Sequence, residues 1–388
     1  MTGDQDPLSI EVYNSVGGAA FFQALLGAWE GAGARVVCHY AVSDPALRSP
    51  RGRLGRLALR WHMYAGQASM CWQGVRTERG RPPLRVVTTN PFFAPALVAR
   101  AARGRGATIN LVYDLFPEAL IQAGTIGPES WIARKCAAIT RFSLRECTAT
   151  VFLGHRLRAY AEEAHGSARR AIVIPVGADG QPFRDSSPAL LPDGVRPRIL
   201  YAGQMGRMHE VDTLAAVWTA PEAASVDWTF HASGPGYRRL KKVVTLRPGV
   251  VLGAALADAT WQQIMRQAQV ALVTIAAGAE RVVMPSKAYS ALVAGQAILA
   301  ICRRTSDLAD LVRQHDCGWV VEPGDHDGLR WVLNCIARDP AAVWAKRRNA
   351  FEAGHRHYDT AKVAEAWMNL FEDVQEGMAP AGSRAGSG

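Results

Sequence analysis

Short runs of apolar, often β-branched residues recur along the chain, each followed by a glycine-bearing loop and then by apolar positions at helical spacing. Most of these runs are apolar at nearly every position, which is typical of parallel strands covered on both faces. The pattern predicts strands over Ser9–Tyr13, Arg35–Tyr40, Leu84–Thr89, Thr108–Tyr113, Ala149–Leu153, Ala171–Pro175, Arg198–Ala202, Val226–Ala232, Gly249–Leu252, Val270–Ile275, Ala297–Ile301 and Gly318–Val321.

Repeated alternation of strand and helix predicts an α/β protein with parallel sheets and right-handed crossovers. Twelve strands in one open sheet are improbable, so we expect two doubly wound, Rossmann-like domains. A proline-rich stretch without periodicity between the halves indicates a linker. The expected division is an N-terminal domain over 1–180, a linker over 181–197, a C-terminal domain over 198–358, a terminal helix over 359–378 and a flexible tail over 379–388.

The composition narrows the class of protein. Of 388 residues, 49% are apolar and 20% are charged, which excludes a largely disordered chain. No run of about eighteen apolar residues occurs, so no transmembrane helix is expected. The first seven residues are acidic and polar, unlike a signal peptide. Seven scattered cysteines without a CxxC pair indicate reduced thiols and a cytoplasmic protein.

The positive charge is concentrated in the first half. Residues 1–185 hold 22 Lys and Arg against 14 Asp and Glu, a net +8, whereas the rest of the chain holds 22 against 20, a net +2. This surplus indicates an anionic partner for the first half. Arginines alternate with apolar residues over 48–72, so this segment is either a basic amphipathic contact with an anionic membrane at its inner face or a solvated helix on the first sheet. No nucleic-acid reader motif occurs, and nucleic acid is not expected as a partner.

Ligands of open parallel sheets bind at the carboxyl ends of the strands, so we expect the site in the cleft between the two sheets. After the first strand, Gly17-Gly18 is either an anion-binding turn or an ordinary tight turn. Asp114 and Glu118 follow the strand Thr108–Tyr113. They either contact a hydroxyl or proton, or Asp114 caps a helix and Glu118 is solvated.

Two turns in the second half have the composition of an anion site. Gly203, Gly206, Arg207 and His209 follow the strand Arg198–Ala202 and lead into a helix, which suits a diphosphate. The turn Gly234-Pro235-Gly236 is more simply an ordinary turn. Pro285-Ser286-Lys287 opens a helix that ends at Gly295. Lys287 opposes the helix dipole there unless an anion binds, the alternative being a lysine that extends into solvent.

In order along almost the whole chain, these segments resemble retaining glycosyltransferases of the GT-B fold, family 4 type, and in particular bacterial sugar transferases of polysaccharide and glycan assembly. The segments that carry the resemblance are Gly17-Gly18, Val112–Glu118, Val173–Pro175, Leu200–Arg207, Gly234–Gly236, Pro285–Tyr289 with Ala294-Gly295, and Gly318–Asp325.

The resemblance implies a nucleotide-sugar donor, UDP-linked in our expectation, and a glycan, lipid-linked or natural-product acceptor on the first domain. It implies that the terminal helices cross back to that domain, and that the departing diphosphate itself takes the acceptor's proton. The residues it would assign are, as catalytic, Asp114, Arg207 and Lys287; as donor-binding, Gly17, Gly18, Gly203, Gly206, His209, Gly234, Leu252, Gly253, Pro285, Ser286 and Ser290; and, as acceptor-binding, Tyr113 and Glu118.

The chain departs from the family pattern at the donor site. The family often has Glu-x7-Glu, but Val282 and Ser290 stand at these two positions, and Glu280 is out of register. These departures leave room for a changed donor preference or for an inactive nucleotide-sugar-binding module. The other alternative is a nucleotide-sugar 2-epimerase of the same fold, which would need carboxylates that converge on the sugar, and Ser290 and Val282 count against it. No metal and no cofactor are expected. The Asp-x-Asp at Asp325 and Asp327 follows a strand and starts a helix, so it is interpreted as a helix cap.

Overall fold

The computed structural model describes residues 8–16, 20–42, 65–66, 68–69, 82–103, 105–192, 194–244 and 247–377. The chain forms two compact units. The first consists of 1–175 together with 363–388, and the second consists of 176–362. Each unit contains one six-stranded sheet, and every recorded strand pair is parallel. The two doubly wound sheets predicted from the sequence are therefore confirmed.

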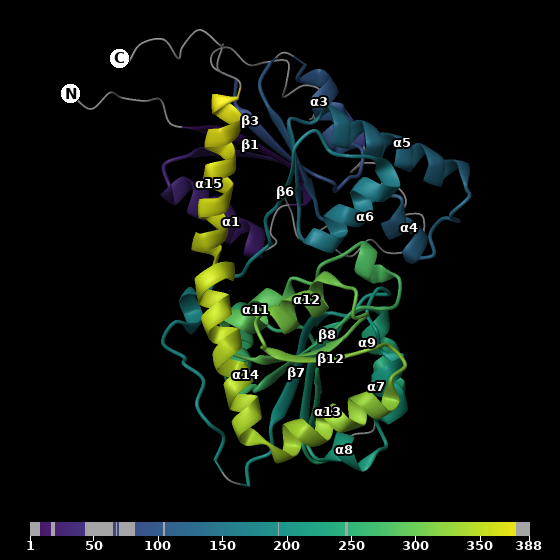
Figure 1. Ribbon diagram of the computed structural model, residues 1–388, viewed down its shortest axis with the longest axis vertical. Coiled ribbons are helices and arrows are strands. Elements are labelled where there is room, and N and C mark those ends of the chain that lie inside the picture. Colours follow the sequence, from purple (N-terminus) through teal and green to yellow (C-terminus); the bar gives the residue numbers. More distant parts are fainter. Residues whose placement is uncertain are drawn as a thin grey trace, which may run out of the picture. The chain divides into compact units, whose positions relative to one another are not determined.

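The sheet of the first unit has the strand order β2-β1-β3-β4-β5-β6. The chain moves across the sheet in one direction from β1 to β2 and in the other direction from β3 to β6. Because each crossover is right-handed, the connecting helices of the two parts cover opposite faces of the sheet. Helix α1 therefore lies on one side, and α3, α5 and α6 lie on the other (Figure 1). The elements are β1 (Ser9–Val16), α1 (Ala20–Gly31), β2 (Arg35–Val42), β3 (Leu84–Thr88), α3 (Ala94–Ala101), β4 (Thr108–Val112), α4 (Glu118–Gln122), α5 (Trp131–Glu146), β5 (Ala149–Phe152), α6 (His155–His165) and β6 (Ala171–Val173).

The last helix, α15 (Thr360–Glu376), begins in the second unit and belongs to the first from Val363 onward. Its apolar face covers α1. The ring of Trp29 lies 5.2 Å from that of Trp367 and 5.1 Å from that of Phe371, and all three side chains are buried. Burial of such aromatic rings is a large apolar contribution to stability, so α15 is an integral part of the first unit's core.

The sheet of the second unit has the strand order β12-β11-β10-β7-β8-β9. Its core includes the buried rings of Trp218, Trp228 and Phe230. The elements are β7 (Arg198–Gln204), α7 (Asp212–Val217), α8 (Pro221–Ala224), β8 (Asp227–Ser233), α9 (Pro235–Val243), β9 (Val250–Gly253), α10 (Asp258–Gln267), β10 (Val270–Thr274), α11 (Lys287–Val293), β11 (Ala297–Ile301), α12 (Asp307–Gln314), β12 (Gly318–Val321), α13 (His326–Arg338), α14 (Pro340–Ala353) and a π-helix (Gly354–Tyr358).

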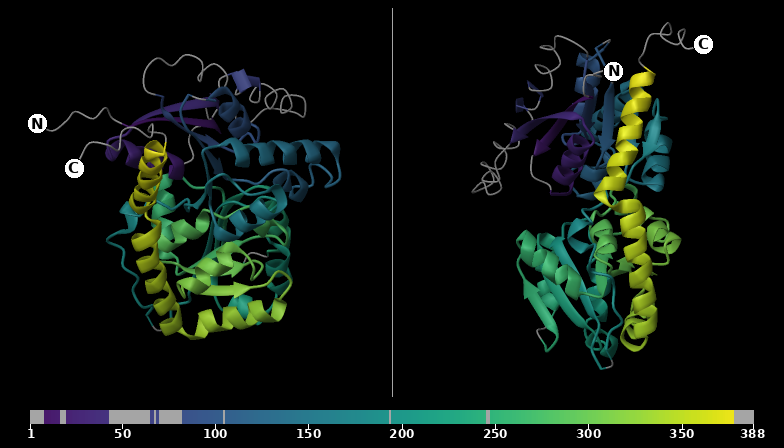
Figure 2. Two further views of the ribbon diagram at one scale, coloured as in Figure 1. Left: turned by 45° about the horizontal axis from the view of Figure 1, so that its top comes forward. Right: turned by 90° about the vertical axis from the view of Figure 1, so that its left-hand side faces the viewer.

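Two features of the second unit differ from a simple doubly wound domain. Helix α13 packs against α7 and α8, and α14 packs against α11, as the two views in Figure 2 show in yellow-green and yellow. Residues 181–197, predicted as a linker, lie within this unit. Phe183 is fully buried, and the Arg347 guanidinium donates to the carbonyl of Ala189 at 2.8 Å. The prolines that suggested a linker therefore belong to a segment packed on the second unit.

All twelve predicted strands are present, with ends that differ by a few residues. Three predictions fall wholly or almost wholly outside the described residues: the Gly17-Gly18 turn, the amphipathic segment 48–72, and the tail 379–388. Among the residues that are described, no helix is long and apolar enough to span a membrane.

Candidate functional site

The turn after β7 is a tight backbone structure at the carboxyl end of the second sheet. Gly203 has φ +111°, a left-handed conformation that favours glycine. Met205 is buried and anchors the turn, because its N–H donates to the Ser233 carbonyl at 2.8 Å and its carbonyl accepts from the Gly236 N–H at 2.9 Å. The next residues, Gly206 and Arg207, are thereby held at the sheet edge.

Gly234 and Gly236 support this turn from the neighbouring strand end. A Cβ on Gly234 would lie 2.6 Å from the Met205 carbonyl oxygen, and a Cβ on Gly236 would lie 2.9 Å from that of Gly206. Both contacts are too short for any side chain, so glycine is required for close packing of the two loops. This matches the interpretation of Gly234-Pro235-Gly236 as an ordinary turn.

Lys287 extends from the first position of α11 to the turn after β7. Its Nζ donates to the Gln204 carbonyl at 3.0 Å and lies 5.4 Å from the centre of the Tyr201 ring. The Lys287 side chain also fills the space above Gly203, where a Cβ would lie 3.1 Å from its Cε. The alternative of a lysine that extends into solvent is therefore wrong. Burial lowers the pKa of Lys287 to about 8.

An ammonium group has three N–H donors, and the Gln204 carbonyl takes one of those of Lys287. That carbonyl also accepts from the Tyr201 hydroxyl at 2.8 Å. The Tyr201 hydroxyl thus holds the Gln204 carbonyl, and this carbonyl holds the Lys287 ammonium over the turn. A cation at a helix start that is partly removed from water has the properties of an anion-binding group.

His209 is part of the same turn but does not add positive charge. The Gly206 N–H donates to its Nδ1 at 3.0 Å, so this nitrogen is an acceptor and the proton of the neutral ring is on Nε2. Burial, and secondarily the charge of Lys287, lower the pKa of His209 to about 4. At neutral pH the ring can therefore offer a diphosphate only a neutral N–H, and its place in the donor site stays a prediction.

The other residues predicted around this turn differ in how far they are exposed to solvent. Arg207 is exposed, and Pro285 is half-buried. Ser286 is the residue before α11, but it has a helical φ of −58° and its side chain makes no capping hydrogen bond, so α11 starts without a side-chain cap. The N–H of Ala276 donates to the Met208 carbonyl at 2.8 Å and ties the loop after β10 to the turn.

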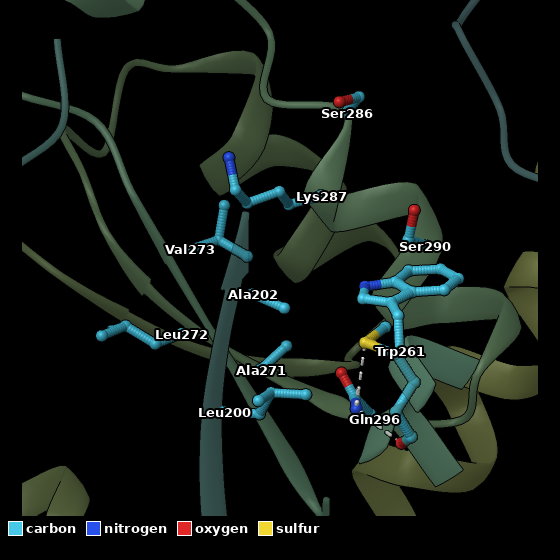
Figure 3. A pocket seen from close by; sticks show the side chains of 11 residues that line it. Leu200, Ala202, Trp261, Ala271, Leu272, Val273, Ser286, Lys287, Ser290 and Gln296 are labelled. Carbon is cyan, nitrogen blue, oxygen red and sulfur yellow. Dashed lines mark hydrogen bonds between the residues drawn. The ribbon is translucent and has the colours of Figure 1, made fainter. Parts of the chain in front are cut away.

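A pocket opens beside Lys287, between the sheet and helices α10 and α11 (Figure 3). Ser286, Lys287 and Ser290 line it from α11, and Trp261 lines it from α10. Its empty space is about 400 Å³, part of which is open to solvent. Ser290 stands where the resemblance leads one to expect a glutamate, and the short serine side chain leaves this space unfilled.

The end of β9 offers less room. Leu252 is half-buried against the core. A Cβ on Gly253 would lie 2.4 Å from Nδ1 of His231, and the Gly253 carbonyl accepts from the Tyr237 hydroxyl at 2.9 Å. Nδ1 of His231 lies 3.1 Å from the Ala254 carbonyl oxygen. The carbonyls of Gly253 and Ala254 at this strand end therefore already have partners within the unit.

In the first unit, Asp114 follows β4 in a turn held by Thr89. The N–H groups of Tyr113 and Asp114 donate to Oγ1 of Thr89 at 3.2 and 3.3 Å, and that hydroxyl donates to the Asp114 carbonyl at 3.0 Å. The Asp114 carboxyl caps no helix, since α4 begins four residues later after Pro117. It lines a small pocket with Asn110, and burial raises its pKa.

Tyr113 and Glu118 have different neighbours. The Tyr113 ring meets that of Phe22, in α1, edge-on at 6.2 Å, which places it near the helix that follows Gly17-Gly18. Oε1 of Glu118 lies 2.9 Å from Nε2 of His165, and both side chains are largely buried. The alternative of a solvated Glu118 is therefore wrong, because the carboxylate joins α4 to α6.

The Asp-x-Asp is a helix cap. The Asp325 side chain accepts from the Gly328 N–H at 2.9 Å at the start of α13, as predicted, whereas Asp327 is exposed and pairs with Arg330. Within the described part of the chain, no group of three or more His, Cys, Asp or Glu is arranged to hold a metal ion.

Residues 196–339, which contain the Gly203–His209 turn, Lys287 and the pocket, match the family model of glycosyl transferases group 1. The chain is a glycosyltransferase of the GT-B fold. It is 22% identical over 336 residues to the probable glycosyltransferase WbjE of Pseudomonas aeruginosa, with 82% of each chain covered. This GT-B glycosyltransferase is similar in structure to sucrose-phosphate synthase from Thermosynechococcus elongatus (TM-score 0.70, 15% identity, 95% of this chain and 100% of the other).

The GT-B glycosyltransferase is also similar in structure to HepE from Anabaena, solved in complex with UDP and glucose (TM-score 0.68, 14% identity, 94% of this chain and 100% of the other). At sequence identities of 15% and 14%, these two structural similarities show the fold alone.

The sequence prediction for this GT-B glycosyltransferase missed two residues. Trp261 and Gln296 line the pocket beside Ser290. Neither residue belongs to a turn at the carboxyl end of a strand, where ligand-binding residues are expected. Gln296 follows Gly295 and precedes β11 in an otherwise apolar stretch. A polar residue in such a stretch is the one sequence signal that could have identified it.

Proposed function

We propose that this glycosyltransferase moves a sugar from a UDP-linked donor to a hydroxyl of a glycan, lipid-linked or natural-product acceptor, with retention at the anomeric carbon. The observation that carries the proposal is the Lys287 ammonium, held over the glycine turn of β7 by the Gln204 carbonyl. HepE, which shares the fold, has been solved with UDP and glucose, and this supports the choice of donor.

In the proposed reaction, the bond between the anomeric carbon and the donor phosphate oxygen breaks, and a bond to the acceptor oxygen forms on the same face. The acceptor's hydroxyl proton passes to the departing diphosphate. Negative charge develops on that diphosphate, so preorganised cations that face it stabilise the transition state. Lys287 and Arg207 fill this role in the proposal, and they replace a metal ion.

Asp114 is proposed to orient the transferred sugar or the acceptor from the first unit, and Tyr113 and Glu118 to contribute to acceptor binding. A half-buried carboxylate can accept hydrogen bonds from hydroxyl groups without becoming a covalent nucleophile. The net +8 of residues 1–185 fits an anionic acceptor or a membrane surface beside it.

The experiment is a donor assay without a natural acceptor. Purified protein is incubated with UDP-, GDP- and ADP-sugars in EDTA, with methanol as a surrogate acceptor, and products are followed by NMR. A transferase releases UDP and forms a methyl glycoside with the donor's anomeric configuration. An inverted glycoside contradicts retention, an isomeric nucleotide sugar indicates an epimerase, and no turnover of any donor contradicts the transferase proposal.

A matched variant separates this activity from contaminants. Lys346→Met removes a lysine of the same unit that is paired with Asp316 at 2.7 Å and lies over the Trp319 ring. In sequence, Lys346 comes after the residues 196–339 that match the family model. It should turn over donor as the wild type does. Lys287→Met should not.

A further inference from the structure

Tyr201, in the middle of β7, contacts the Lys287 ammonium with both parts of its side chain, the ring directly and the hydroxyl through one carbonyl. Nζ of Lys287 lies 5.4 Å from the centre of the Tyr201 ring. The Tyr201 hydroxyl donates to the Gln204 carbonyl at 2.8 Å, and Nζ of Lys287 donates to the same carbonyl at 3.0 Å. The ammonium is therefore bounded by an aromatic ring and by a carbonyl that the same tyrosine holds.

The Gln204 carbonyl can accept from both donors at once, because a carbonyl oxygen has two lone pairs. The hydroxyl of Tyr201 therefore does not compete with the ammonium of Lys287. Burial raises the pKa of the Tyr201 hydroxyl, so it remains a donor throughout the pH range in which Lys287 titrates. The hydroxyl thus fixes the direction of the carbonyl whether Lys287 is charged or neutral.

The Tyr201 ring stabilises an ammonium that has no counter-charge in the protein. Burial lowers the pKa of Lys287 to about 8, and among the described residues no carboxylate pairs with it. The titratable groups recorded against this ammonium in the same part of the chain are Tyr201 and His209, and His209 is neutral at pH 7. The face of an aromatic ring carries a negative potential, which stabilises a cation most where water is excluded. The ring therefore favours the charged form of Lys287.

Packing alone does not require a tyrosine at this position. Tyr201 is 1% exposed and belongs to the apolar core of the second unit. Phenylalanine would fill a core position of this kind without a polar atom to satisfy. The His209 ring meets that of Tyr201 edge-on at 6.2 Å, which also holds the tyrosine ring from the turn. The hydroxyl directed at the Gln204 carbonyl and the ring against the ammonium are both accounted for by Lys287.

We propose that Tyr201 is a positioning residue for Lys287, whose ring keeps the buried ammonium charged and whose hydroxyl fixes the carbonyl that holds this ammonium over the turn. For its effect on catalysis the inference rests on the proposed function, in which Lys287 faces the departing diphosphate. A cation that is fixed before the reaction stabilises the charge that develops there. The effect of Tyr201 on the charge of Lys287 does not depend on any donor.

The test is an NMR titration of the full chain with its lysines labelled with ¹³C at Cε. The chain has six lysines, and Lys287→Met identifies the Lys287 signal by its loss. In the wild type this signal should titrate near pH 8. Tyr201→Leu should lower the midpoint by about one pH unit, the size expected for a cation over a ring away from water. Tyr201→Phe keeps the ring and should titrate close to the wild type.

The matched control is Tyr237→Leu. Tyr237 is also buried, its hydroxyl donates to the Gly253 carbonyl at 2.9 Å, and its ring centre lies 5.0 Å from Nζ of Lys241. Its loss should leave the midpoint of Lys287 unchanged. Because Tyr201→Leu also leaves space in the core, pentafluorophenylalanine in place of Tyr201 gives a second test. It has nearly the shape of phenylalanine and a ring face of reversed potential, so its midpoint should fall below that of Tyr201→Phe.

Donor kinetics test the hydroxyl. Tyr201→Phe should lower kcat about threefold to tenfold with little change in the KM for donor, because it loses one hydrogen bond that places the cation. A midpoint that is unchanged or raised in both ring variants overturns the role of the ring, and a wild-type kcat in Tyr201→Phe overturns that of the hydroxyl. If Lys287→Met is inactive in either case, the proposed function stands without Tyr201. If the midpoints shift as expected but Lys287→Met turns over donor at the wild-type rate, Tyr201 sets the charge of Lys287 and the proposed function fails.

Discussion

Replacing Lys287 by methionine should stabilise the fold while it abolishes donor turnover. Burial lowers the pKa of Lys287 from 10.5 to about 8, and each pH unit corresponds to about 1.4 kcal/mol. The charged ammonium therefore costs the folded state about 3.5 kcal/mol at most. Its hydrogen bond to Gln204 and its contact with the Tyr201 ring offset about 1–2 kcal/mol of that cost. Lys287→Met should consequently raise the free energy of unfolding by about 2 kcal/mol.

The sign of the pH dependence is fixed by the direction of the shift. Between pH 8 and 10.5 the unfolded state binds the Lys287 proton and the folded state has lost it, so wild-type stability from this group rises with pH in that window. Lys287→Met lacks this term, and its advantage should disappear as the pH is raised from 7 to above 9. Urea unfolding followed by tryptophan fluorescence at both pH values measures the difference.

The stability of a control variant and the donor kinetics of Lys287→Met are measured as well. Lys346→Met should not be stabilised, because it removes the ion pair of Lys346 with Asp316 at 2.7 Å. The kcat/KM of Lys287→Met for the donor should fall about 30- to 1,000-fold, equivalent to about 2–4 kcal/mol of lost transition-state stabilisation. A Lys287→Met variant that is less stable than wild type at pH 7 would contradict the cost of the buried ammonium. Donor turnover by this variant at the wild-type rate would contradict the role of Lys287 at the diphosphate.

Asp114→Asn should lose part of the transfer rate and Asp114→Ala more, with no glycosyl adduct on Asp114 by mass spectrometry; an adduct would indicate double displacement. The kcat/KM for donor should decline as the pH rises through about 8, because Lys287 of the free enzyme loses its charge, and a profile flat to pH 10 would contradict this. Gly234→Ala should lower the thermal midpoint far more than Gly166→Ala, since both glycines have positive φ but only Gly234 faces a backbone atom at 2.6 Å. Equal midpoints would show that the clash relaxes.

The sheets and the strand ends could be predicted because they depend on local patterns. Continuous apolar runs identify parallel strands wherever they lie in the chain, and the glycines after β7 and β8 identify turns. Lys287 was a candidate because a cation at a helix start conflicts with the dipole, and the structure gives this side chain a specific acceptor in Gln204. Each of these inferences uses residues that are neighbours in sequence.

The rest depends on contacts between distant segments. The neutral state of His209 follows from its burial beside Lys287 and its hydrogen bond from Gly206, and no sequence pattern encodes either. The pocket beside Lys287 requires α10 to cover the sheet beside α11, so that Trp261 and Gln296 line one pocket although they are 35 positions apart in sequence. Prolines mark irregular backbone but do not reveal whether it is packed, which is why 181–197 was predicted as a linker.

In the proposed function, the second unit binds a donor diphosphate through Arg207 and Lys287 without a metal ion. Calorimetric titration of UDP into the wild type, Arg207→Ala and Lys287→Met, all in EDTA, tests it most directly. We expect saturable binding of UDP to the wild type, and each substitution should weaken it at least tenfold. UDP binding that requires a divalent cation, or that both variants retain at wild-type affinity, would contradict it.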